Sequence, residues 1–150
     1  MKNLARTCYS ILVVLILISC KKDNIEDTDL PHQEEDKIIT FTGSDNILYT
    51  LSLIQPAAPK IGINDLEVQI DKKGSGNNVS PVKDLTLAFT PRMPHMGNHS
   101  SPNNVDPVHS NDGRYKGKVN FTMSGDWRLH FTIKRGDEVL AEDVALDLLF

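Results

Sequence analysis

Apolar and polar residues alternate with a period of two along most of the chain after residue 36. Such alternation predicts β-strands that bury one face and expose the other. It is clearest where Leu66, Val68 and Ile70 share one face, because charged and amide side chains occupy the positions between them. Clusters of Gly, Pro, Asn and Asp separate the runs, as is typical of turns. Strands are predicted at 47–53, 64–71, 84–90, 115–123, 127–134 and 144–148.

The predicted elements are all strands. Outside the first 19 residues, no segment has the 3.6-residue periodicity of an amphipathic helix. About 110 residues of short strands and turns are typical of two packed sheets, so we predict an all-β, immunoglobulin-like antiparallel β-sandwich of six to seven strands. A small barrel is the alternative. Trp127 and Tyr115 are expected in the core, and His130 is expected on an exposed strand face.

One segment, between Thr90 and Arg114, has more than twenty residues without a strand pattern. Loops of this length in compact domains are usually functional or disordered. This one holds most of the residues with soft or imidazole side chains after residue 36: Met93, His95, Met96, His99 and His109. Pro91 and Pro94 lack a backbone N–H, so the segment is not expected to continue a central strand. His109 is expected to be solvated.

The start of this segment favours a metal site. Pro94 suits the second position of a β-turn from Met93 to Met96, and such a turn holds its first and last Cα atoms within about 7 Å. Both thioethers would then converge, with His95 or His99 beside them. Thioether sulfur and imidazole nitrogen together favour Cu(I) over hard cations.

Met123 is a further candidate ligand, because it directly precedes the turn at Ser124–Gly125. The pattern does not determine which end of the sandwich this residue reaches. In the alternative interpretation the methionines are core residues, and Met93 and Met96 plug the open end of the sandwich. Asp106 and Asp112 would suit a hard ion instead, but they lack the spacing of a calcium loop.

The N-terminus predicts export. Lys2 and Arg6 precede a short apolar run from Tyr9 to Ile18, which is under the roughly 20 residues that a membrane span needs. Cys20 follows Ser19, and this arrangement resembles the lipobox of bacterial lipoproteins. The resemblance implies cleavage before Cys20 and acylation of its thiol and amine. We expect a signal peptide at 1–19, a lipidated Cys20 with a disordered acidic tether to residue 36, and a domain at 37–150. A plain secretory signal with a chance Cys is the alternative.

Charge and cysteine content narrow the possible functions. Cleavage after residue 19 removes two positive charges, so the net charge changes from −4 to −6. An acidic domain beside a membrane is a poor candidate for nucleic-acid binding. With Cys8 removed and Cys20 lipidated, no thiol remains for nucleophilic catalysis or a zinc-thiolate site. No nucleophile elbow, His-Glu-x-x-His motif or phosphate-binding Gly loop occurs, so we do not expect an enzyme.

Three motifs in order resemble the YtkA-like domain family. They are Met93-Pro94-His95-Met96-Gly97-Asn98-His99, then Gly113-Arg114-Tyr115-Lys116-Gly117, then Met123-Ser124-Gly125-Asp126-Trp127. The resemblance covers roughly residues 47–150 and implies an immunoglobulin-like sandwich on the outer face of a membrane. It also implies copper binding, and a link of the protein to heavy-metal efflux or copper-oxidase assembly systems. The family often has Gly-His directly after the second Met, whereas Asn98 intervenes here, so His99 departs from the pattern.

These observations predict a lipid-anchored copper-handling protein of the cell envelope. Lys-Lys-Asp after Cys20 resembles outer-membrane lipoproteins of Bacteroidetes-type bacteria, facing either the periplasm or the outside. The expected function is to carry Cu(I) to an oxidase or an efflux component. The candidate ligands are Met93, Met96, His99, Met123 and His95. The alternative is a module without metal, in which residues 91–113 dock a membrane protein.

Overall fold

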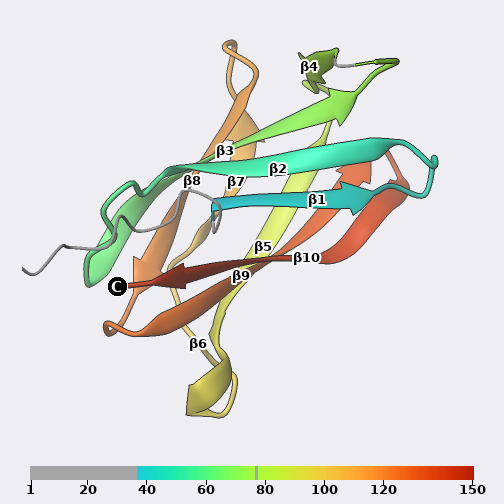
Figure 1. Cartoon of the computed structure of the whole chain (residues 1–150). Coiled ribbons are helices and arrows are strands. Elements are labelled where there is room, and N and C mark those ends of the chain that lie inside the picture. The colour runs from blue at the N-terminus through green and yellow to red at the C-terminus, as the bar shows by residue number, and fades with distance from the viewer. Residues whose placement is uncertain (1–36, 77) are drawn as a thin grey trace, which may run out of the picture. The chain divides into compact units, whose positions relative to one another are not determined.

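The computed structural model describes residues 37–76 and 78–150, which form two antiparallel β-sheets (Figure 1). The predicted signal peptide, Cys20 and the tether lie outside the described residues. In the part that is described, no helix is long and apolar enough to cross a membrane.

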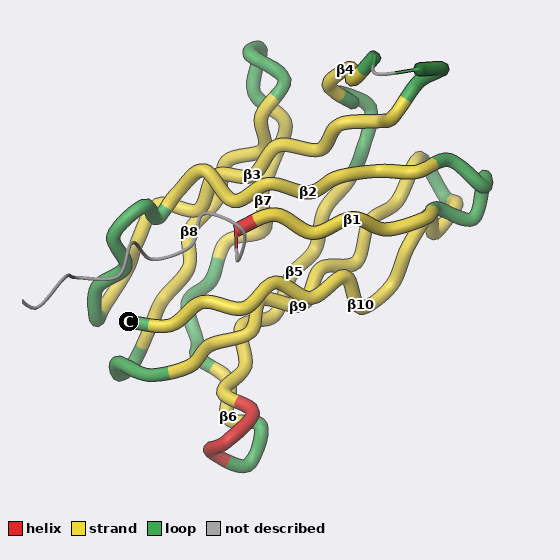
Figure 2. Tube along the Cα trace, viewed as in Figure 1, coloured by secondary structure: helices red, strands yellow, loops and turns green. Residues whose placement is uncertain are grey.

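Ten strands make up the two sheets, and they account for most of the chain trace (Figure 2). The six-stranded sheet has the order β1-β2-β3-β8-β7, with β4 paired to β3, and the four-stranded sheet has the order β10-β9-β5-β6. The bounds are β1 Ile38–Thr42, β2 Leu48–Gln55, β3 Gly62–Lys73, β4 Val79–Pro81, β5 Thr86–Met93, β6 His99–Ser100, β7 Val105–His109, β8 Arg114–Phe121, β9 Asp126–Arg135 and β10 Glu138–Leu149. The prediction of an antiparallel β-sandwich is therefore confirmed.

The core lies between the sheets and consists of the predicted inward positions. Leu66, Val68 and Ile70 are at most 1% exposed, and the alternate residues of β9 from Trp127 to Ile133 are equally buried. Tyr115 is fully buried as predicted: its hydroxyl donates to the carbonyl of Val82 at 2.9 Å and accepts from the N–H of Leu85 at 3.2 Å. Within the described residues, 37–76 and 78–150, the paired strands enclose one hydrophobic core, so the domain from residue 37 is expected to fold on its own.

The prediction that 91–113 lacks strands is wrong. β5 continues to Met93, and β6 and β7 lie within the segment. Together with β1 and β4, which were also not predicted, they raise the number of strands above the six to seven expected. Pro91 fits into β5 because of the open edge there. The N–H of Phe89 faces away from β9 and donates to Asp106 Oδ1 at 3.0 Å. Pro91 lies two residues further along β5, so its nitrogen also faces away from β9. The missing N–H of proline therefore removes no hydrogen bond between β5 and β9.

Candidate metal site

The β5–β6 hairpin carries most of the candidate ligands at one end of the sandwich. A 3-10 turn of Pro94–Met96 follows β5, in agreement with the tight turn predicted there, and forms the tip of the hairpin (Figure 2). Gly97 and Asn98 then adopt positive φ angles of 62° each. This reverses the chain, so that His99 and Ser100 pair with Met93 and Arg92.

The two methionines of this turn have opposite environments. Met93 is only 3% exposed and belongs to the core, whereas Met96 is 56% exposed. Met93 is the last residue of β5 and shares the inward parity of Leu87 and Phe89, which explains its burial. The alternative interpretation, in which Met93 and Met96 both plug the end of the sandwich, therefore holds for Met93 and is wrong for Met96, which is exposed to solvent.

Met123 lies at the same end of the sandwich as Met93, which the sequence pattern left open. The turn between β8 and β9 contains Met123 and Gly125, and it packs against the end of β5. A Cβ atom added to Gly125 would lie 2.9 Å from Met93 Cε, which shows how closely that methyl group approaches the turn. Met123 itself is 37% exposed, and its carbonyl accepts a hydrogen bond from Trp127 Nε1 at 3.0 Å.

His95 links the hairpin tip to the start of β9, the neighbour of β5 in the same sheet. Its Nε2 lies 3.1 Å from Asp126 Oδ2, and both side chains are largely exposed. Asp126 is the first residue of β9 and follows the turn that carries Met123. The sequence reasoning missed this carboxylate. The available signal was its position directly after Gly125 in the third motif.

The donor chemistry of this end is soft. Within 37–76 and 78–150, no three His, Cys, Asp or Glu side chains gather in a way that could hold a metal ion. A site here would thus depend on thioethers supplemented by imidazole from His95 or the exposed His99. Soft donors of this kind fit Cu(I) better than Zn²⁺ or Ca²⁺.

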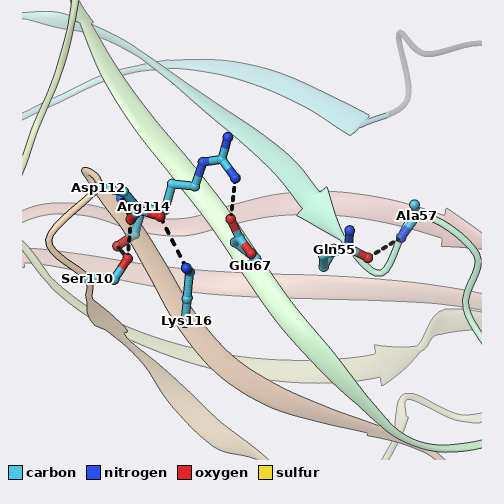
Figure 3. A network of polar contacts seen from close by, with 7 residues as sticks. All are labelled: Gln55, Ala57, Glu67, Ser110, Asp112, Arg114 and Lys116. Carbon is cyan, nitrogen blue, oxygen red and sulfur yellow. Dashed lines mark hydrogen bonds and ion pairs between the residues drawn. The ribbon is translucent and has the colours of Figure 1, made fainter.

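The remaining candidate side chains have structural partners. Asp106 caps the edge of β5, as described above. Asp112 accepts hydrogen bonds from the Ser110 hydroxyl and from Lys116 Nζ at 3.1 Å, and these contacts lower its pKa (Figure 3). Neither carboxylate is therefore placed for a hard-ion site. Figure 3 also shows the neighbouring ion pair of Arg114 with Glu67, at 2.6 Å.

Two histidines outside the hairpin were assigned no ligand role. His109 is exposed as predicted, and its ring packs edge-on against Tyr115 at a centroid distance of 5.4 Å. His130 was expected to be exposed, but its side chain is only 25% exposed, because a bulge in β10 brings the Asp143 carboxylate onto Nδ1.

The comparison with known families decides the classification. A family model described as YtkA-like matches residues 44–132, which is more than half of the chain. The chain belongs to the YtkA-like family. The YtkA-like match includes the hairpin tip and the β8–β9 turn, and it ends within β9, so β10 lies beyond it. No curated protein and no solved structure matches the chain significantly.

Proposed function

We propose that this YtkA-like protein binds Cu(I) at the end of the sandwich formed by the β5–β6 hairpin and the β8–β9 turn. The observation that carries the proposal is the packing of Met93 Cε against Gly125, which holds the two ligand-bearing turns together. Met96 and Met123 come from different turns and are both accessible to an ion from solvent. They are the first ligands, and imidazole nitrogen from His99 or His95 completes the set.

Met93 has a supporting role in this proposal. With 3% exposure, its thioether cannot meet an ion from solvent unless the end of the sandwich rearranges. Its burial instead fixes the hairpin against the β8–β9 turn. Asp126 accepts at Nε2 of His95, which leaves Nδ1 of that ring for a metal.

The exposure of the ligands suits a carrier rather than an enzyme. Thioethers carry no proton at neutral pH, so their binding of copper does not depend on titration. An ion held on exposed turns by two soft neutral ligands can pass to a thiolate or His-rich acceptor. We therefore propose delivery of copper to an oxidase or to an efflux component. Lipidation at Cys20 would hold the protein in the cell envelope, at the outer membrane.

A Cu(I) titration of residues 37–150 against a chromophoric chelator tests the proposal. The variant Met96→Leu/Met123→Leu keeps apolar side chains but removes both thioethers, so a one-to-one site in the wild type should be lost. Met93→Leu is the matched control, because it makes the same chemical change at a buried position, and copper binding should persist. Failure of the wild type to compete with the chelator at any ratio would refute the copper proposal.

The second candidate is docking of a membrane protein without metal. It is favoured by the 56% exposure of Met96 at the tip of a projecting hairpin, where an apolar side chain is available for contact. The double Leu variant separates the two candidates. Leucine preserves apolar contact, so a docking function survives the substitution, whereas a copper function does not.

A further inference from the structure

A second candidate site lies at the other end of the sandwich. β5 and β9 run antiparallel, so Asp84 and Arg135 lie at the end away from Met93 and Asp126 (Figure 1). Residues of both sheets line an open cleft of about 540 Å³ at this end. This volume falls within the range of small-molecule sites in proteins. Its lining includes the buried residues Tyr49 and Val82.

Each sheet contributes a cation to the lining of this cleft, at a strand position that follows a series of inward residues. In β3, Lys72 continues the series Leu66, Val68 and Ile70, and it pairs in register with Tyr49 of β2. In β9, Arg135 continues the series that ends with Ile133. Lys72 is exposed at this end of β3, whereas Arg135 is partly buried and needs anionic partners.

Arg135 has its partners within the protein. Its Nη1 donates to Asp45 Oδ2 at 3.0 Å, its Nε to Asp84 Oδ2 at 3.1 Å and its Nη2 to the Tyr49 hydroxyl at 3.1 Å. The Tyr49 hydroxyl in turn donates to Asp45 at 2.7 Å, and this bond is the main reason that the pKa of Asp45 is lowered. The network fixes Arg135 and uses both carboxylates, while two of the five guanidinium N–H groups remain for another acceptor.

Lys72 and Lys83 have no such partner. Among the residues that the structure describes, no carboxylate lies within ion-pair distance of either ammonium group. Lys83 has its stem against the β7–β8 turn, because a Cβ added to Gly113 would lie 3.4 Å from Lys83 Cε. The cleft is therefore lined by three cations and one carboxylate, Asp84, which is held by Arg135, in a chain whose net charge is −4.

We propose that this cleft binds a small organic anion that carries a phosphate or carboxylate group beside a short apolar part. Lys72 and Lys83 bind the charged group, since both residues line one cleft and neither pairs with a carboxylate among the described residues. The apolar part rests on Ile47 and Pro81, the lining apolar residues that are not buried. The fixed guanidinium of Arg135 offers its remaining N–H donors from the opposite sheet. This site is independent of the copper proposal, because it lies at the far end of β5.

Calorimetric titration of the full chain, kept in solution with a mild detergent, tests the proposal with phenyl phosphate and benzoate as probes. At least one probe should bind saturably at one site. Loss of a charge-assisted hydrogen bond should weaken that binding roughly tenfold in Lys72→Gln and again in Lys83→Gln. Lys73→Gln is the matched control: it makes the same change on the same strand, but the next position faces the other side of the sheet. Its affinity should equal that of the wild type.

Several outcomes would overturn the proposal. One is the absence of saturable binding for both probes. A second is an equal loss in Lys73→Gln, which would indicate a general charge effect. A third is phenol binding as tightly as phenyl phosphate, since the lysines would then contribute nothing. Circular dichroism of each variant checks the fold, which exposed Lys→Gln substitutions should leave intact.

Discussion

The packing of Met93 against Gly125 can be tested by adding a single carbon atom. Gly125→Ala places a Cβ that would lie 2.9 Å from Met93 Cε, well inside the roughly 3.5–4.0 Å separation that two carbon atoms prefer. Gly125 also has φ 132°, a conformation that L side chains rarely adopt. Its backbone cannot relax freely, because its N–H donates to the carbonyl of Phe150 at 2.8 Å.

The two effects have separable magnitudes. Backbone strain of a non-glycine residue in this region costs about 1–3 kcal/mol. Overpacking against the Met93 methyl group costs about 1–3 kcal/mol, toward the lower end because a Met side chain can shift its terminal atoms. We expect Gly125→Ala to lower the free energy of unfolding by about 3 kcal/mol, a large part of the ~5–15 kcal/mol stability of a typical domain.

A double-mutant cycle in urea isolates the steric part. Met93→Ala removes the methyl group and by itself costs about 2–5 kcal/mol, as for other buried Met residues. In the double variant the clash is absent, so the combined loss should be smaller than the sum by about 1 kcal/mol or more. Gly136→Ala is the matched control: Gly136 has φ 59° but nothing within 4 Å of an added Cβ, so its substitution should show backbone strain and no coupling to Met93.

Two results would refute the reasoning. If Gly125→Ala changes the free energy of unfolding by less than about 0.5 kcal/mol, the turn does not have the close contact described. If the coupling to Met93 is no larger than that of Gly136→Ala, the hairpin and the β8–β9 turn are not held together by this methyl group. The copper proposal would then lose the observation that carries it.

Three further predictions concern stability. Met96→Ala should change the free energy of unfolding in urea by less than about 0.5 kcal/mol, because Met96 is exposed; a loss of several kcal/mol would contradict its position. Tyr115→Phe should cost about 1–3 kcal/mol, since it leaves the buried carbonyl of Val82 and N–H of Leu85 without their hydroxyl partner. Burial raises the pKa of Tyr49 and Tyr115, so the unfolded chain ionises first. The contribution of these two tyrosines to stability should therefore be constant below about pH 10 and fall as the pH rises toward the folded pKa values, less steeply in Tyr115→Phe. Chemical denaturation across this pH range measures the slope, and a stability that rises there would contradict the burial of the phenols.

Met93 and Met96 show which part of the candidate site could not be predicted from the sequence. The tight turn at Pro94–Met96 followed from local backbone chemistry, and it is present. Whether each thioether faces the core or solvent depends on where β5 ends. That end depends on the open edge beside Pro91 and on Asp106, which is distant in the sequence. A proline in a run of residues predicts the end of a strand only when its nitrogen would face a partner strand.

The strands β6 and β7 were missed for a related reason. Each is a short edge strand: β6 has two exposed residues, and β7 buries only Pro107. Neither shows the alternation that a half-buried strand produces. They form because longer neighbours, β5 and β8, offer free backbone groups for pairing.

The sequence by itself determined the fold class, the inward residues of the long strands and the family, because period-two patterning and the three motifs are local properties of the chain. Only the tertiary structure decided which residues meet. It put Met123 at the end that holds Met93, and it brought Lys72, Lys83 and Arg135 to the opposite end. The physical reason is that strand register and the order of strands in each sheet decide which of these residues lie at the same end of the sandwich. Both are set by hydrogen bonds and packing between segments that are far apart along the chain.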